Sequence, residues 1–107
     1  MIIEIDVAEK RATARGEPTI VCGNGGYQIH FTFDDEWAAE NRKTARFVYT
    51  AEDKTDHIDV DFDGTDVNVP ILYNIDEVLV GVYVGDRLTT TPAHIPCERS
   101  IRCHAAT

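Results

Sequence analysis

The chain has 107 residues, of which 43% are hydrophobic, and a formal net charge of -9. This length and composition predict one globular domain with a single core over residues 1–107, rather than a disordered chain. The chain is most acidic over residues 34–66, with eleven carboxylates against four Lys or Arg, which disfavours binding to nucleic acid or to anionic membranes.

The first predicted element is a half-buried strand over residues 3–7, where isoleucine and valine alternate with acids. It follows Met1 directly, with neither a basic leader nor a long apolar run, so no signal peptide is predicted. No stretch approaches the ~20 apolar residues that span a bilayer. Residues 9–17 are polar and lack a pattern, so we expect them to form a connection.

A glycine-rich loop, Gly23-Asn24-Gly25-Gly26, lies between two strand-like segments, residues 19–22 and 27–33. Because Asn-Gly supplies positive φ at low cost, the loop predicts a β-hairpin. The second segment is strongly amphipathic. After it, Asp34 is placed to cap a short helix over residues 35–40, which Trp37 would anchor by packing.

The next predicted strands are marked by apolar alternation over residues 45–49 and 58–62. Asp63-Gly64 is a turn signal, and Val67 and Val69 predict a short returning strand. Residues 70–73 begin with proline and predict a tight helical turn or a bend.

Residues 78–84 are almost continuously apolar, so they predict the central strand, buried on both faces. Gly85-Asp86 predicts the next turn. Residues 88–95 predict a threonine-rich strand in which Pro92 marks a sheet edge or a bulge. Residues 102–107 are expected to be a loose end. The sum is an all-β fold, an immunoglobulin-like β-sandwich of seven to eight mainly antiparallel strands with one or two short helical turns.

Three cysteines, an odd number, favour reduced thiols over a disulfide framework. Cys22, Trp37 and Cys97 imitate the Cys–Trp–Cys spacing of immunoglobulin domains. The match is weak because Trp37 sits in an acidic turn and Cys22 lies at a strand end. In addition, Ile95 stands where a tyrosine is expected. A structural Cys22–Cys97 bridge is therefore not predicted.

Two groups of residues invite a metal site. Asp59, Asp61 and Asp63 before Gly64 match the opening of a calcium-binding EF-hand loop, but Pro70 occupies the position of the bidentate acid. A strand with a charged solvent face explains them better, with adventitious calcium as the alternative. The soft donors His94, Cys97, Cys103 and His104 lack the paired C-x2-C spacing of structural zinc sites, so no metal or other cofactor is predicted.

Catalytic and phosphate-binding patterns are weak. The loop over residues 23–26 is followed by a strand rather than the helix that a phosphate cradle needs. Ser100 is the only serine and lies near the chain end, and His30, His57, His94 and His104 are scattered. We therefore predict no enzyme. Trp37, Tyr73 and Tyr83 could stack on a sugar, although core packing is the simpler use of a single tryptophan.

Residues 31–37 (Phe-Thr-Phe-Asp-Asp-Glu-Trp) and 43–47 (Lys-Thr-Ala-Arg-Phe) resemble a "FTFDEEW…KTARF" pattern of small proteins and N-terminal domains from tailed phages and prophages of Clostridia-like bacteria. Residues 69–70, 80–85, 87–91 and 95–96 resemble the second half of that pattern, so the resemblance extends over residues 18–101. It rests on residues that form the fold and carries no catalytic signature.

The resemblance implies a virion component of the tail tip, baseplate or fibre base that docks other tail proteins. We therefore expect a non-enzymatic structural protein that acts through protein–protein contacts, forms a homo-oligomer and reaches the virion after synthesis in the host cytoplasm. In such proteins a longer fibre segment often follows, so this chain is expected to be a stand-alone accessory protein or a piece of a longer one. The alternative is a carbohydrate- or cell-surface-binding β-sandwich.

Overall fold

Strands dominate the computed structural model, which describes residues 1–101. The elements are β1 (Ile2–Ala8), β2 (Arg11–Ala14), β3 (Ile20–Val21), β4 (Gln28–Phe33), the 3-10 helix η1 (Asp35–Trp37), β5 (Arg42–Ala51), β6 (Lys54–Asp63), β7 (Asp66–Asn68), β8 (Glu77–Val84), β9 (Leu88–Thr89) and β10 (Ala93–Glu98). The mainly-β prediction is confirmed. These ten strand segments exceed the expected seven to eight because three of them are only two or three residues long.

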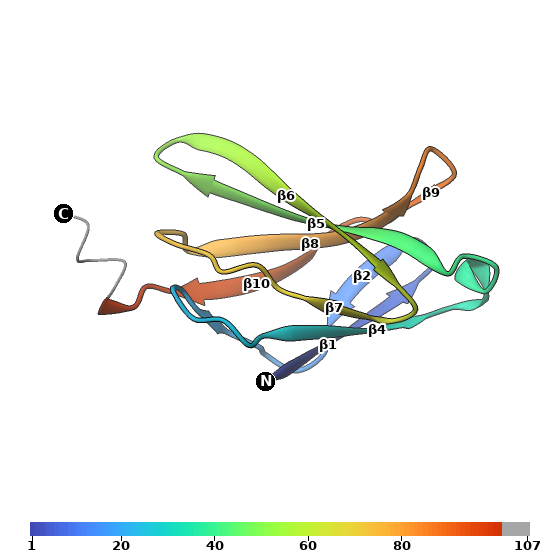
Figure 1. Cartoon of the computed structure of the whole chain (residues 1–107), viewed down its shortest axis with the longest axis horizontal. Helices are drawn as coiled ribbons and strands as arrows, with labels where there is room; N and C mark the ends of the chain where they lie inside the picture. Colours follow the sequence, from blue (N-terminus) through green and yellow to red (C-terminus); the bar gives the residue numbers. More distant parts are fainter. Residues whose placement is uncertain (102–107) are drawn as a thin grey trace.

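The strands form two sheets (Figure 1). The first has the order β2-β1-β4-β7, and the second has the order β3-β10-β8-β5-β6, with β9 paired to β8. Most neighbours are antiparallel, but β1 pairs with β4 in parallel and β3 pairs with β10 in parallel. The predicted central strand is confirmed, because β8 lies between β10 and β5.

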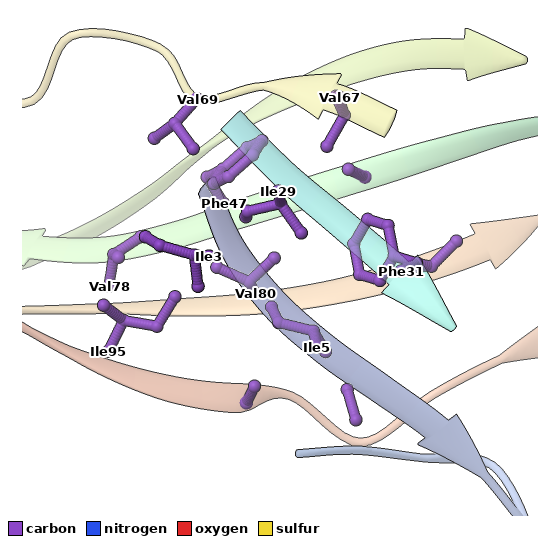
Figure 2. Close-up of a cluster of buried hydrophobic side chains, with 14 of the residues drawn as sticks. Ile3, Ile5, Ile29, Phe31, Phe47, Val67, Val69, Val78, Val80 and Ile95 are labelled. Carbon is purple, nitrogen blue, oxygen red and sulfur yellow. The ribbon is translucent and has the colours of Figure 1, made fainter. Parts of the chain in front are cut away.

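The core lies between the two sheets and is built from the alternating apolar positions of both (Figure 2). On one side are Ile3, Ile5, Ile29 and Phe31, and on the other are Phe47, Val78, Val80 and Ile95. The prediction that residues 78–84 are buried on both faces is wrong. Val78, Val80 and Val82 are buried, while Leu79, Gly81 and Tyr83 face outward and are half-buried.

The glycine-rich loop is not a hairpin turn. Residues 20–21 (β3) join the second sheet beside β10, whereas β4 joins the first sheet beside β1, so residues 23–26 carry the chain from one sheet to the other. The amide of Gly23 donates to the carbonyl of Leu72 at 2.7 Å, and the amide of Val21 donates to the hydroxyl of Tyr27 at 3.0 Å. These hydrogen bonds fix the position of the loop that connects the two sheets.

Residues 9–17 hold a strand as well as a connection. Glu9 and Lys10 both have positive φ, 53° and 63°, and turn the chain back so that β2 pairs antiparallel with β1. Positive φ at both central residues is the geometry of a tight two-residue hairpin. Neither residue is glycine or asparagine, which explains why sequence reasoning missed this hairpin. The carboxylate of Asp34 accepts the Glu9 amide at 2.9 Å and so stabilises the turn.

Of the helix predicted over residues 35–40, only the three residues of η1 are helical, and the Asp34 side chain does not cap them. Trp37 anchors this segment as expected, being only 2% exposed, with its ring 5.2 Å from the Phe33 ring. Residues 70–73 form no helical turn; the chain is irregular there, with a bend at Asn74. The predicted strand over residues 88–95 is divided into β9 and β10, with Pro92 in the interruption.

One flank of the sandwich is joined across the two sheets. Thr91, in the interruption between β9 and β10, donates its amide to the carbonyl of Lys10 at 2.9 Å. The amide of Ala12, on β2, donates in turn to the carbonyl of Thr91 at 3.3 Å. We call these two bonds the Thr91 seam. The expected loose end, residues 102–107, lies outside the described residues.

Candidate interaction surface

The outward face of the second sheet carries a hydrogen-bonded polar group on β5, β6 and β8. Arg46 donates from Nε and Nη2 to the two carboxylate oxygens of Asp59 at 2.8 and 3.0 Å. Tyr83 donates its hydroxyl to the same carboxylate at 3.0 Å, and the guanidinium lies 5.1 Å from the Tyr83 ring centroid. The Arg46 hydrogen bonds, aided by that of Tyr83, hold the pKa of Asp59 below its usual value.

The other two acids of the calcium-like motif lie along the same face of β6. Asp61 accepts the Thr44 hydroxyl at 2.7 Å, and Arg42 lies 3.6 Å from Asp61 and 3.4 Å from Asp63. Gly64 follows in the turn with φ of 76°. The three acids therefore form a row along a strand, each beside a residue of β5. Within residues 1–101 no three His, Cys, Asp or Glu side chains gather as metal ligands do.

Among residues 1–101, the outer edge of β6 is the longest unpaired strand edge of this sheet. Gly64 donates its amide to the carbonyl of Asn41 at 3.0 Å, which continues the register that pairs Arg42 with Asp63. Hydrogen-bonded and non-hydrogen-bonded pairs alternate in an antiparallel ladder. Asp56, Ile58, Val60 and Phe62 therefore turn their backbone groups toward β5. The exposed residues between them turn theirs outward: Thr55, His57, Asp59, Asp61 and Asp63.

This edge is long and regular compared with the others. β6 has ten residues and no proline, whereas β2, β3 and β7 have four, two and three residues. One outward amide is already used, because His57 donates to the carboxylate of Asp56 at 2.7 Å. We call the outward backbone groups of residues 55, 57, 59, 61 and 63 the β6 edge. Such an edge is a template for another strand.

Beside the β6 edge lies an apolar hollow of about 150 Å³. Its lining comes from the inner face of the β5–β6 hairpin and from the irregular segment before β8: Tyr49, Ile58, Ile71, Leu72, Tyr73 and Ile75. Ile71 and Tyr73 are 47% and 53% exposed, which is unusual for large apolar side chains. Figure 1 shows the hairpin standing over this segment.

The three aromatic candidates for sugar stacking lie in different places. Trp37 is in the core, so its faces are covered by protein. Tyr83 is half-buried and one face is occupied by Arg46. Tyr73 alone is exposed, at the rim of the apolar hollow. The structure therefore brings no two of them together as a platform.

The remaining predicted site residues are also dispersed. His30 contacts Asp66 at 2.6 Å and His94 contacts Glu77 at 3.2 Å, on different sheets, while His57 is on β6. Ser100 follows β10. Cys103 and His104 lie outside the described residues, and Cys97 is buried while His94 is exposed, so these two do not share a face of β10.

Cys22 and Cys97 are buried in the core, and no disulfide joins them. The Cys22 thiol donates to the carbonyl of Ile75 at 3.4 Å, and the Cys97 thiol donates to that of Ile95 at 3.7 Å. Burial, with the adjacent Cys22 thiol, raises the pKa of Cys97 to about 12. A thiol that remains protonated is a poor nucleophile, so Cys97 is suited to packing rather than to chemistry.

Comparisons with known proteins add no family. No model of a known protein family matches the chain, and no curated protein matches it either. Among the described residues there is no helix whose length and apolar character would let it cross a bilayer. The β6 edge and the hollow were missed by sequence reasoning, because a strand's alternation reveals its faces but not its neighbours. The exposed acids on β6 were the available signal, since charge often marks an edge.

Proposed function

We propose that this chain is a non-enzymatic structural protein of a phage or prophage virion, located at the tail, baseplate or fibre base, and that it works by binding other tail proteins. The observation that carries the proposal is the β6 edge, a ten-residue strand whose outer backbone groups face solvent. Proteins usually shorten or cover such edges. A long one in a small sandwich is suited to strand addition by a partner.

The sequence resemblance supplies the biological setting, and the structure supports a binding role in two further ways. Exposed apolar side chains gather beside the edge, at Ile71 and Tyr73, where a partner could bury them. The polar residues of the outward face are held by one another, as in the Arg46–Asp59 pair, so the surface is preorganised. Copies of the chain would take part in the symmetric assembly that tail structures require.

Mass spectrometry of purified particles from the bacterium that carries the gene tests this proposal. We expect peptides of this chain in intact particles, in amounts comparable to those of known tail proteins. Deleting the gene should leave particles with incomplete tails. Particles that contain no trace of the chain, together with normal tails after deletion, would rule the proposal out.

A further inference from the structure

The backbone groups of the β6 edge are spaced so that an extended chain can form a ladder of hydrogen bonds with them. The amides of Thr55, Asp59, Asp61 and Asp63 point outward, and their neighbours on β6 are committed to β5. An added strand would place its own side chains alternately on the two faces of the enlarged sheet. The chemistry of each face of β6 therefore determines which residues the partner must carry at alternate positions.

The inner face is apolar over Ile58, Val60 and Phe62, although Lys54 and Asp56 lie on the same side near the hairpin turn. Ile58 and Val60 are half-buried there, and the hollow beside Ile58 opens between the exposed side chains of Ile71 and Tyr73. Its volume, about 150 Å³, is that of a cavity able to hold a benzene ring. One large apolar side chain of an added strand would fill it. The inward residues of the partner are therefore apolar.

The outer face is acidic. On this face β6 carries Asp59, Asp61 and Asp63 beside Thr55 and His57, and no Lys or Arg. Asp59 accepts hydrogen bonds from Arg46, whereas Asp61 and Asp63 lie 3.6 and 3.4 Å from Arg42, and their side chains are more than half exposed. A basic side chain directly opposite would be attracted to them. The outward residues of the partner are therefore basic.

A second copy of the chain brings acids together wherever the acidic end of β6 pairs with itself. Antiparallel self-pairing centred on Asp59 places that residue opposite itself. A pairing centred on Asp61 places Asp61 opposite itself and Asp59 opposite Asp63. Like charges directly across a strand pair are destabilising, and the chain as a whole carries a net charge of -9. A basic segment avoids this repulsion and is the better partner for the acidic end of the edge.

We infer that the β6 edge receives an extended segment of a different protein, in which apolar residues alternate with lysine or arginine and one large apolar side chain enters the hollow between Ile71 and Tyr73. This inference rests on the proposed function and specifies the partner chemistry for the same surface. The segment adds one antiparallel or parallel strand to the second sheet, next to β6.

A ten-residue capped peptide that alternates lysine with valine or isoleucine is the probe, and the same peptide with every lysine replaced by glutamate is its control. Amide hydrogen exchange of the full chain, followed by NMR, should show the amides of residues 55, 59, 61 and 63 slowed about tenfold or more by the lysine peptide. In low salt it should bind about tenfold more tightly than the glutamate peptide, or about 1.4 kcal/mol. High salt should reduce this difference.

Matched variants locate the site. Asp61→Pro removes an outward amide without touching the β5 pairing, whereas Asp61→Ala removes the same side chain and keeps the amide. We expect the proline variant to bind the lysine peptide about tenfold more weakly than the alanine variant. Ile71→Ser should weaken binding several-fold. Ile2→Ser, which changes another exposed isoleucine on β1, should not. The exchange measurement on the unaltered chain does not depend on any variant folding.

Three results would overturn the inference: equal binding of both peptides, protection at another sheet edge, or a dimer in light scattering that Asp61→Pro abolishes. The last result would assign the edge to a second copy of the chain. None of them bears on whether the chain is found in virions, so failure here is distinct from failure of the proposed function.

Discussion

The Nζ atom of Lys43 lies 4.9 Å from the centroid of the Phe33 ring, although Lys43 belongs to the second sheet and Phe33 to the first. The same ammonium donates to the carbonyls of Glu40 and Asn41, at 2.6 and 3.0 Å, and the residue is only 4% exposed. Burial lowers its pKa. Lys43 therefore closes one end of the core. Its aliphatic chain packs among aromatic rings, and its ammonium group donates hydrogen bonds to backbone carbonyls.

Replacing Lys43 by alanine should lower the free energy of unfolding by about 1–3 kcal/mol, because packing, ring contacts and two hydrogen bonds are lost together. Lys43→Met should cost less, since it keeps the stem. Lys54→Ala, in the exposed hairpin, is the control and should change stability by less than about 0.5 kcal/mol. Urea unfolding measures all three, and equal effects of the two alanine variants would contradict this role for Lys43.

Stability should fall in acid partly through Asp59. Its pKa is lowered from 3.8 by Arg46, so the folded state favours the carboxylate. This contribution is present above pH 3.8 and is lost as the pH falls through the folded-state pKa. Urea unfolding at a series of pH values from 5 to 2 should show a flatter dependence for Asp59→Asn. The control, Asp86→Asn in the exposed turn after β8, should keep the slope of the unaltered protein.

At alkaline pH the buried thiol of Cys97 should make the protein less stable as the pH rises. Its pKa rises from 9.0 to about 12 on folding, so between these values the unfolded chain loses a proton that the folded chain keeps. Stability therefore decreases as the pH rises above 9, by at most about 1.4 kcal/mol per pH unit. Cys97→Ala should show a shallower decrease in unfolding experiments from pH 8 to 11. Identical slopes would show that the thiol is not protected.

Gly81 on β8 should not accept a side chain. An added Cβ would lie 3.2 Å from Oγ1 of Thr90, the atom that accepts the Val82 amide at 3.1 Å. Gly81→Ala is therefore expected to cost about 1–2 kcal/mol in thermal or urea unfolding. In the Thr90→Ala background the cost should shrink, giving a coupling of at least about 0.5 kcal/mol. Gly25→Ala, where the nearest atom is 3.6 Å away on the Ile71 side chain, is the matched control and should be tolerated.

Tryptophan fluorescence tests the position of Trp37, the only tryptophan. Its burial predicts blue-shifted emission, little quenching by iodide, and no change on adding sugars. Trp37→Ala should cost about 3–5 kcal/mol, as large-to-small core substitutions do. Emission typical of a solvated indole, or a shift on adding sugars, would restore the carbohydrate-binding alternative.

Sequence reasoning located the long strands well, because two-residue alternation over many residues directly reports a half-buried strand. The segments around Ile5, Phe31 and Phe47 show this. It was less successful for β2 and β9. These strands have four and two residues, too few to establish a period, and the turn at Glu9 before β2 carries no glycine or asparagine.

Sheet order was beyond reach for a different reason. The glycine-rich loop after Cys22 suggested a local hairpin. Instead, β4 pairs in parallel with β1, so that Gln28 lies beside Ile2, twenty-six residues earlier in the sequence. Which strands pair in a β-sandwich depends on how the whole faces of the sheets are buried. The sequence pattern of a single strand does not contain this information. The same limitation concealed the β6 edge, since Asp59 and its neighbours reveal which side faces water but not whether a strand lies alongside.

The Thr91 seam has a consequence for where a partner strand can be added. It ties β2 to the segment between β9 and β10 on one flank, through Lys10 and Ala12, while β6 lies at one end of the second sheet. Backbone groups that already bond within the chain are no longer offered to another chain. The proposed strand addition is therefore directed to β6 rather than to the β2 flank.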